Sequence, residues 1–233
     1  MKDISMQKRV QSSESGNAMV YVLIVVALFA ALSFVLARTS GSNEHSALDA
    51  EKINIYASQI IQTANQVKQG VNQVVYSGSN INDLNFCLPG EVCFTSAPLY
   101  NNVFHPEGGG MVRPHIQGDA LNTVNNDPAP GWYIGRFNNV EWTQTAADDV
   151  VLAAHQIRQD VCAQINELLT GSPVIPQLTI EINTALIADT RHSNGPNVNL
   201  DTTNCAACDG LPALCVANAA GTIWSYYSII EQQ

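Results

Sequence analysis

The stretch ESGNAMVYVLIVVALFAALSFVLARTSGSN, residues 14 to 43, decides the fold of the N-terminal part of this chain. From Ala18 to Ala37 it holds twenty residues without a charge. A helix of that length spans about 30 Å, which matches the hydrocarbon thickness of a bilayer. A secretory signal that is removed has a shorter apolar core of about 7 to 15 residues and ends in a small-x-small site. Leu36-Ala37-Arg38 is a poor match to such a site, so the segment is predicted to stay on the protein as a transmembrane helix.

Charges and cysteines on the two sides of this segment predict its orientation. Lys2, Lys8 and Arg9 precede it, and only Arg38 follows it closely, so the positive-inside rule places the N-terminus in the cytoplasm. The chain has six cysteines, and all of them follow the apolar segment. An even number of cysteines on one side of a membrane indicates disulfides in an oxidising compartment, although reduced thiols in a cytosolic protein are the alternative.

The junction before the apolar segment resembles the class III signal of type IV prepilins and pseudopilins. A short polar leader ends in Ser15-Gly16, and small and apolar residues follow at once. The resemblance implies cleavage between Gly16 and Asn17 by a prepilin peptidase, with the apolar helix retained on the mature subunit. The family usually carries Glu at the fifth mature position, where this chain has Tyr21. An uncleaved signal anchor is the alternative interpretation.

The resemblance also implies a function, a location and partners. The chain would be a structural subunit of an extracellular filament like a type IV pilus, with copies of itself and the assembly machinery as partners. Before assembly it would lie in the inner membrane with its head in the periplasm. The residues expected to form the assembly helix are Ala18, Tyr21, Val25, Leu28, Leu32 and Val35. The other hypotheses are a membrane-anchored protein whose head binds a partner, and an exported enzyme.

The sequence predicts an α+β protein with a long N-terminal helix and a small, disulfide-containing globular head. The expected organisation is a cytoplasmic leader over 1–16, a transmembrane and assembly helix over 17–38, a hinge and amphipathic stalk helix over 39–76, and a head over 77–233. Apolar residues at three- and four-residue intervals predict the second helix from Ala47 to Val75. Gly41 and its polar neighbours predict a hinge or break before it.

Within the head the patterns predict loops and short strands, then one helix and two strands. Residues 77 to 139 are rich in Gly, Pro and Asn. The aromatic segment around Asn138-Asn139, which includes Trp132, Tyr133, Phe137 and Trp142, predicts a β-hairpin. A helix is expected after an N-cap at Thr145, with a buried face from Val150 to Leu168 and an end at Gly171. Strands are expected around Leu178 to Ile182 and around Ile223 to Ile229.

The cysteine spacing predicts structural disulfides that involve all of the cysteines: Cys87, Cys93, Cys162, Cys205, Cys208 and Cys215. A Pro-Gly turn brings Cys87 and Cys93 close enough to pair. The other four cysteines allow three connectivities. The pairing of Cys162 with one member of the C-x-x-C motif, and of the other member with Cys215, is weakly favoured. A redox motif is one alternative for the C-x-x-C pair, but its flanking sequence is typical of a loop. A zinc site is the alternative for all four cysteines, but four thiolates are not expected to stay reduced outside the cytoplasm.

No motif indicates catalysis or a cofactor. The chain lacks G-x-S-x-G, H-E-x-x-H, a P-loop and G-x-G-x-x-G. His105, Glu107 and His115 are the best candidates for metal ligands, but their spacing matches no known metal motif, so no metal site is predicted. His155 and Asp160 are expected on one helix without facing each other. From Arg38 onward seven basic residues face eighteen acidic ones, which argues against nucleic acid as a partner.

Overall fold

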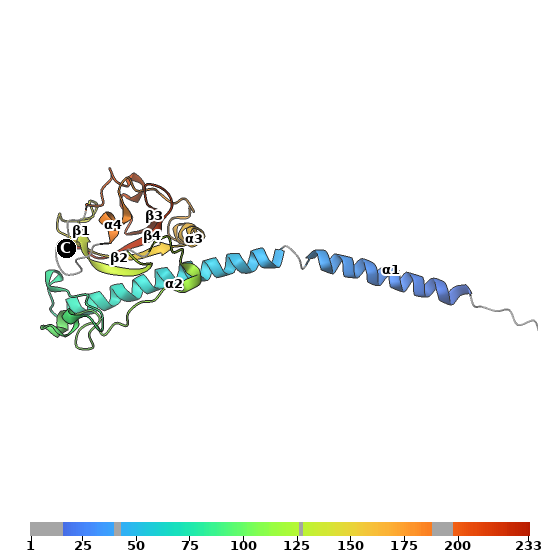
Figure 1. Cartoon of the computed structure of the whole chain (residues 1–233), viewed down its shortest axis with the longest axis horizontal. Coiled ribbons are helices and arrows are strands. Elements are labelled where there is room, and N and C mark those ends of the chain that lie inside the picture. The colour runs from blue at the N-terminus through green and yellow to red at the C-terminus, as the bar shows by residue number, and fades with distance from the viewer. Residues whose placement is uncertain (1–15, 40–42, 126–127, 188–197) are drawn as a thin grey trace, which may run out of the picture. The chain divides into compact units, whose positions relative to one another are not determined.

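The computed structural model describes residues 16–39, 43–125, 128–187 and 198–233 (Figure 1). The chain divides into two compact units, Met1–Ala50 and Glu51–Gln233, and the second is called the head unit below. The first unit contains α1 (Gly16–Thr39) and the start of α2 (Asn43–Tyr76). The predicted leader lies outside the described residues, as does the centre of the predicted hinge at residues 40–42. The amphipathic helix predicted from Ala47 to Val75 is confirmed, because α2 contains that range.

The described part of the head unit contains one antiparallel sheet of four strands. These are β1 (Gly131–Asn138), β2 (Asp149–Ile157), β3 (Ala213–Ala217) and β4 (Trp224–Glu231), in the order β1-β2-β4-β3. The predicted mixture of helices and strands is therefore confirmed, as is the last strand near the C-terminus. Two helices follow β2 in the chain, α3 (Gln159–Thr170) and α4 (Ile182–Leu186). Short 3-10 turns make up much of the segment from 81 to 120.

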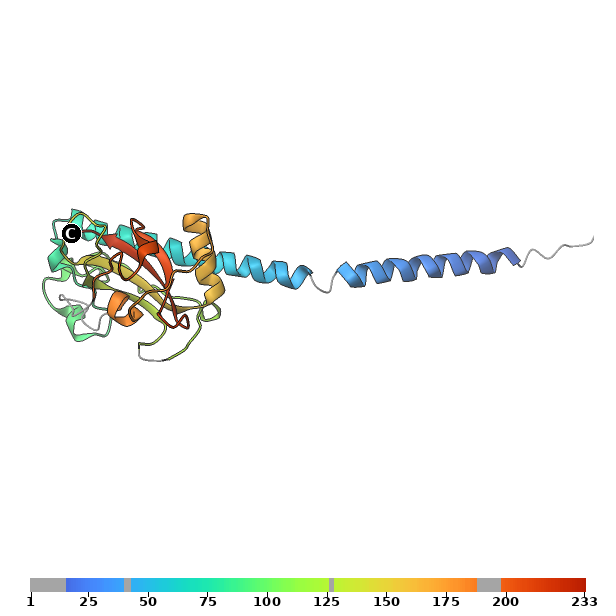
Figure 2. The same cartoon turned by 90° about the horizontal axis from the view of Figure 1, so that it is seen from above.

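The sheet is covered on both faces (Figure 1 and Figure 2). Alternate residues of β2 belong to two different cores. Val150, Leu152 and Ala154 pack with the apolar stripe of α2 and with α3, whereas Val151 and Ala153 pack with α4 and the chain around Leu200. Successive side chains of a strand point to opposite faces, so a central strand that is covered on both faces has its side chains buried on both. All nine residues of β2 are buried for this reason.

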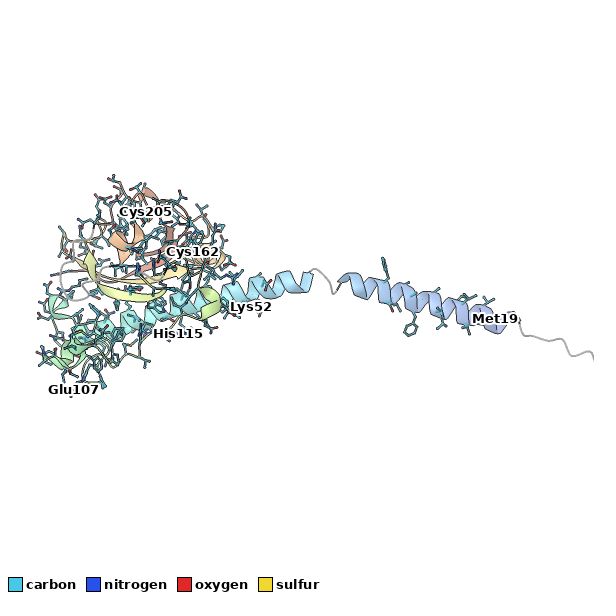
Figure 3. The ribbon with its side chains drawn as sticks, viewed as in Figure 1. Met19, Lys52, Glu107, His115, Cys162 and Cys205 are labelled. Atoms are coloured by element: carbon cyan, nitrogen blue, oxygen red, sulfur yellow. A yellow bond between two sulfur atoms is a disulfide. The ribbon has the colours of Figure 1, made fainter. Side chains whose placement is uncertain are left out.

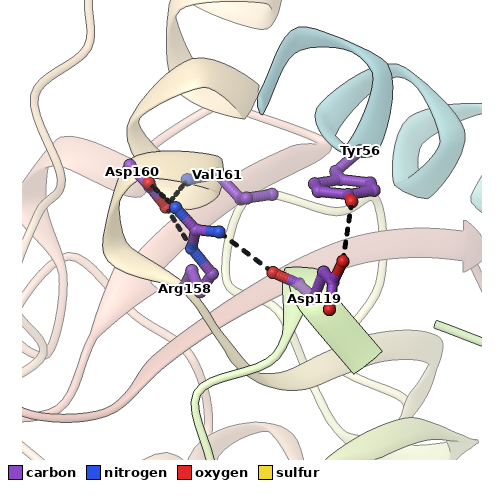
Figure 4. A network of polar contacts seen from close by, with 5 residues as sticks. All are labelled: Tyr56, Asp119, Arg158, Asp160 and Val161. Atoms are coloured by element: carbon purple, nitrogen blue, oxygen red, sulfur yellow. Dashed lines mark hydrogen bonds and ion pairs between the residues drawn. The ribbon is translucent and has the colours of Figure 1, made fainter. Parts of the chain in front are cut away.

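The stripe of α2 that enters the first core recurs every three or four residues, as an amphipathic helix requires. Its fully buried members are Ala57, Ile60, Ala64, Val67, Val71 and Val74. A polar network lies at the N-terminal end of this stripe (Figure 4). Tyr56 donates a hydrogen bond to the Asp119 carboxylate at 3.4 Å, and Arg158 donates to the Asp119 carbonyl at 3.1 Å while it pairs with Asp160. The network joins α2 to the start of α3.

The helix predicted from Thr145 is wrong over its first half. Residues 149 to 157 form β2, and α3 begins only at Gln159, with Asp160 in its first turn. An apolar segment that is buried on two faces has no polar side, so its pattern also fits a buried helix. The predicted end is confirmed, since Gly171 ends α3 in the left-handed conformation with φ 74°.

Two strand predictions in the head also need correction. The segment from Leu178 to Ile182 forms no strand: Gln177 makes one isolated bridge to Ala217, and α4 begins at Ile182. The aromatic hairpin does not turn at Asn138-Asn139, because β1 pairs with β2 across a longer connection. The buried Asp149 carboxylate holds that connection by accepting the Val140 N–H and the Thr143 hydroxyl, both at 3.0 Å. Burial raises the pKa of Asp149.

All six cysteines form disulfides, as predicted, but two of the three pairs differ from the favoured connectivity. Cys87 pairs with Cys93 across the expected turn. Cys162 of α3 pairs with Cys215 of β3, and Cys205 pairs with Cys208 inside the C-x-x-C motif. The docking of α3 on the edge strand brings Cys162 and Cys215 together, with their Cα atoms 5.4 Å apart. That contact depends on tertiary packing, so the spacing of the cysteines in the sequence gives no indication of it.

Candidate functional site

The helix α1 presents an apolar surface to solvent. Every side chain that the structure describes in it, from Met19 to Phe34, is exposed, and none of these residues carries a charge. Met19 is 77 % exposed, and Leu28 and Leu32 are each 59 % exposed. Soluble monomeric proteins rarely expose apolar patches larger than a few hundred Å². This surface is therefore the strongest candidate for an interaction site.

The predicted assembly residues lie along one side of α1. Tyr21, Val25, Leu28 and Leu32 follow each other at intervals of four, three and four residues, so their side chains project from the same face of a helix. The side chains of Ala18 and Val35 lie outside the described residues. The other faces of α1 are also apolar, because Val22, Leu23, Val26 and Phe29 are all more than half exposed. An all-round apolar surface fits lipid or several neighbouring helices better than one partner groove.

The predicted cleavage junction lies at the start of α1, whose first residue is Gly16. The side chain of Asn17 lies outside the described residues. In the part of the chain whose side chains are described, no helix reaches the length and apolar character of a membrane span.

The three residues considered as metal ligands do not form a group within ligand distance. Figure 3 shows Glu107 and His115 well apart in the head unit. The His105 ring packs on Phe94 with centroids 5.0 Å apart, and its Nδ1 accepts the Glu107 N–H at 3.2 Å. Among the described residues, the group that does meet within 4.8 Å is Cys87, Glu91 and Cys93. Both of those cysteines are disulfide-bonded, so they offer no thiolate to a metal.

The expectation that His155 lies on a helix with Asp160 is wrong. His155 is a fully buried residue of β2, and its Nδ1 lies 2.8 Å from the Ser225 hydroxyl on β4. Burial lowers the pKa of His155 to about 4, so the ring is neutral at pH 7. Ser225 is also fully buried, so a substrate cannot reach the pair. Sequence reasoning missed this pair because the two residues are brought together only by the pairing of β2 with β4.

The chain matches no family model, no curated protein and no solved structure. A functional assignment must therefore rest on the residues of the chain and on their geometry. The exposed apolar helix is the feature with the clearest physical requirement, because it needs a covering partner or a membrane.

Proposed function

We propose that this chain is a pilin-like structural subunit that assembles into an extracellular filament through the packing of α1. Before assembly, the segment from Ala18 to Ala37 holds the subunit in the inner membrane with its head unit on the periplasmic side. The observation that carries the proposal is the exposure of every described apolar side chain of α1 from Met19 to Phe34. Copies of the same helix would cover these side chains in a filament.

Two further features support an exported subunit. The basic residues of the leader, Lys2, Lys8 and Arg9, precede the apolar segment, in agreement with a cytoplasmic N-terminus. All six cysteines of the head unit are paired, which fits a protein that works in an oxidising compartment. The packing of α2 against an antiparallel sheet also supports the proposal, since it leaves a compact head attached to an N-terminal helix.

The second candidate function is a membrane-anchored protein whose head binds a partner and does not form filaments. Tyr21 favours it, because the resemblance to pilins implies a glutamate at this position that pairs with the amino terminus of the neighbouring subunit. A tyrosine has no carboxylate to make that pair. The two candidates agree on export and differ on the assembly role of α1.

Cleavage is tested by mass spectrometry of the N-terminus of the exported protein. We expect a chain that begins at Asn17, and we expect Gly16→Leu to leave the leader attached. Ser15→Ala, a change next to the junction, serves as the control and should leave cleavage intact. If the exported wild-type chain retains Met1, the prepilin interpretation is wrong, and the alternative of an uncleaved signal anchor is the one supported.

Assembly is tested by electron microscopy of the cell surface. Leu28→Ala and Leu32→Ala keep α1 apolar but remove volume from the face that should pack, so filaments should become shorter or disappear while the amount of protein in the membrane stays constant. Leu168→Ala is the matched control, because Leu168 is 47 % exposed on α3. Filaments that persist when residues 18 to 35 are replaced by an unrelated membrane helix would contradict assembly through α1.

A further inference from the structure

A cavity of about 290 Å³ opens in the head unit between the segment 113–116 and the start of β1. Arg113, His115, Leu121 and Trp132 are among its lining residues. Arg113 and Trp132 also line an adjoining pocket whose other walls include Phe86. The two hollows therefore share an arginine and an indole, and the floor of the second is apolar.

The charge of this cavity is opposite to that of the molecule. The chain has a net charge of −10, yet no carboxylate lines either hollow among the residues that the structure describes. Arg113 and His115 are exposed, and within the described part of the chain their side chains form no hydrogen bond or ion pair. A guanidinium with free N–H groups is suited to a carboxylate, which it can bind through two parallel hydrogen bonds.

An unusual residue of β2 holds chain segments that adjoin the lining residues Leu121 and Pro130. Gln156 is fully buried and has φ 56°, a left-handed conformation that is costly for a residue other than glycine. Its side chain accepts the backbone N–H groups of residues 124 and 125 at 2.6 and 3.1 Å and donates to the Pro128 carbonyl at 2.9 Å. Leu121 bridges to Ile157, and Gly131 pairs with His155 in the sheet. The lining residues Leu121 and Gly131 are therefore held by the sheet before any ligand arrives, which lowers the entropy cost of binding.

We propose that this cavity binds a single pyranose unit that carries a carboxylate, which is a uronate. The carboxylate would pair with Arg113 and His115. The apolar C–H face of the sugar would lie against Trp132, whose half-buried indole lines both hollows. The hydroxyl groups would meet the main chain at 114–116 and 130–131, where both donors and acceptors are present.

The volume of the cavity and the charge of the protein around it favour a uronate over other anions. A cavity of about 290 Å³ has room for one sugar ring. A polyanionic chain would extend beyond the cavity over a protein in which, from Arg38 onward, eighteen acidic residues face seven basic ones. A simple carboxylate would leave Trp132 uncovered. The proposal concerns the head unit alone and does not depend on filament formation.

Calorimetric titration of the full chain tests this site. The protein is kept in a zwitterionic detergent without a sugar headgroup and is titrated with methyl glucuronide, methyl glucoside and acetate. We expect saturable binding of the glucuronide and at least about tenfold weaker binding of the other two. Arg113→Ala should weaken the binding of the glucuronide roughly tenfold or more. Lys52→Ala, which removes one positive charge from an exposed position on α2, should leave it unchanged.

Arg113→Lys and Trp132→Phe complete the set, with circular dichroism as the check on folding. The lysine retains the charge and loses the two parallel hydrogen bonds, so its affinity should lie between wild type and Arg113→Ala. The phenylalanine keeps a smaller aromatic ring in the apolar contact, so the affinity for the glucuronide should fall several-fold. The proposal is overturned if the glucoside or acetate binds as tightly as the glucuronide, if Arg113→Ala binds like Lys52→Ala, or if no saturable binding occurs.

Discussion

Asn166 of α3 gives the sharpest test of how the head unit is held together. β3 is an edge strand, and the amide of Asn166 takes the place of a neighbouring strand at Cys215. Its Oδ1 accepts the Cys215 N–H at 2.7 Å, and its Nδ2 donates to the Cys215 carbonyl and to the Val174 carbonyl, both at 2.8 Å. Asn166 is fully buried, so water cannot replace these bonds. Cys162, one turn earlier on α3, is disulfide-bonded to the same residue, Cys215.

We expect Asn166→Ala to lower the free energy of unfolding by about 3 kcal/mol. Each of the three hydrogen bonds contributes about 1 kcal/mol, and the unsatisfied groups left behind add to the loss. For a unit of this size the corresponding drop in Tm is about 6 to 12 °C. Urea unfolding of the oxidised protein, followed by circular dichroism, measures the change.

Asn166→Asp separates hydrogen bonding from packing because it keeps the volume of the side chain. The introduced carboxylate still accepts the Cys215 N–H, but its second oxygen faces two carbonyl oxygens, so the loss at pH 7 should equal or exceed that of Asn166→Ala. Protonation restores one donor. Because the folded variant then binds a proton more tightly than the unfolded chain, its stability relative to wild type should rise as the pH falls from 7 to 5. Asn183→Asp, the same change at an exposed position of α4, should show no such recovery. A loss below about 1 kcal/mol in Asn166→Ala, or parallel pH profiles for wild type and Asn166→Asp, would refute this account.

Three more expectations follow from the head unit. Since burial lowers the pKa of His155 from 6.5 to about 4, the unfolded chain binds more protons between these values. The contribution of His155 to the free energy of unfolding is fully present above pH 6.5 and falls by about 3 kcal/mol as the pH drops to 4. His155→Asn should remove this pH dependence of the free energy of unfolding, which urea unfolding measures. Replacing Cys162 and Cys215 together with alanine should lower the free energy of unfolding by about 4 kcal/mol, because the bridge closes a long loop. Gly108→Ala places a Cβ 2.1 Å from a backbone oxygen and should lower Tm markedly, whereas Gly118→Ala, with open space around it, should change Tm little.

The helical periods of α2 and the presence of disulfides were predictable from sequence because both are local or compositional properties. An apolar residue every three or four positions defines one face of a helix, whatever surrounds it. The turn in CLPGEVC brings Cys87 and Cys93 together within seven residues, so their pairing followed from the turn itself. The pairing of Cys162 with Cys215 depends on a contact between distant segments, and it leaves Cys205 and Cys208 to pair with each other. Spacing gave no means of choosing among their three connectivities.

The two candidate sites also differ in whether the local sequence predicts them. The apolar character of α1 follows from its composition, and the residues of its proposed assembly face follow from the helical repeat. Both can therefore be predicted from the sequence. The cavity beside Trp132 could not be predicted, because its walls come from segments around 113, 121 and 131 that only tertiary packing brings together.

The sequence by itself determined that this protein has an apolar helix, an amphipathic helix and an acidic, cysteine-paired head. Tertiary structure alone decided that residues 149 to 157 form a strand. Val150 to Ile157 are apolar at nearly every position, so their own pattern fits a buried helix as well as a buried strand. Hydrogen bonds to β1 on one side and β4 on the other resolve the ambiguity. Those bonds depend on partners as far away as Glu231, which no local window of sequence contains.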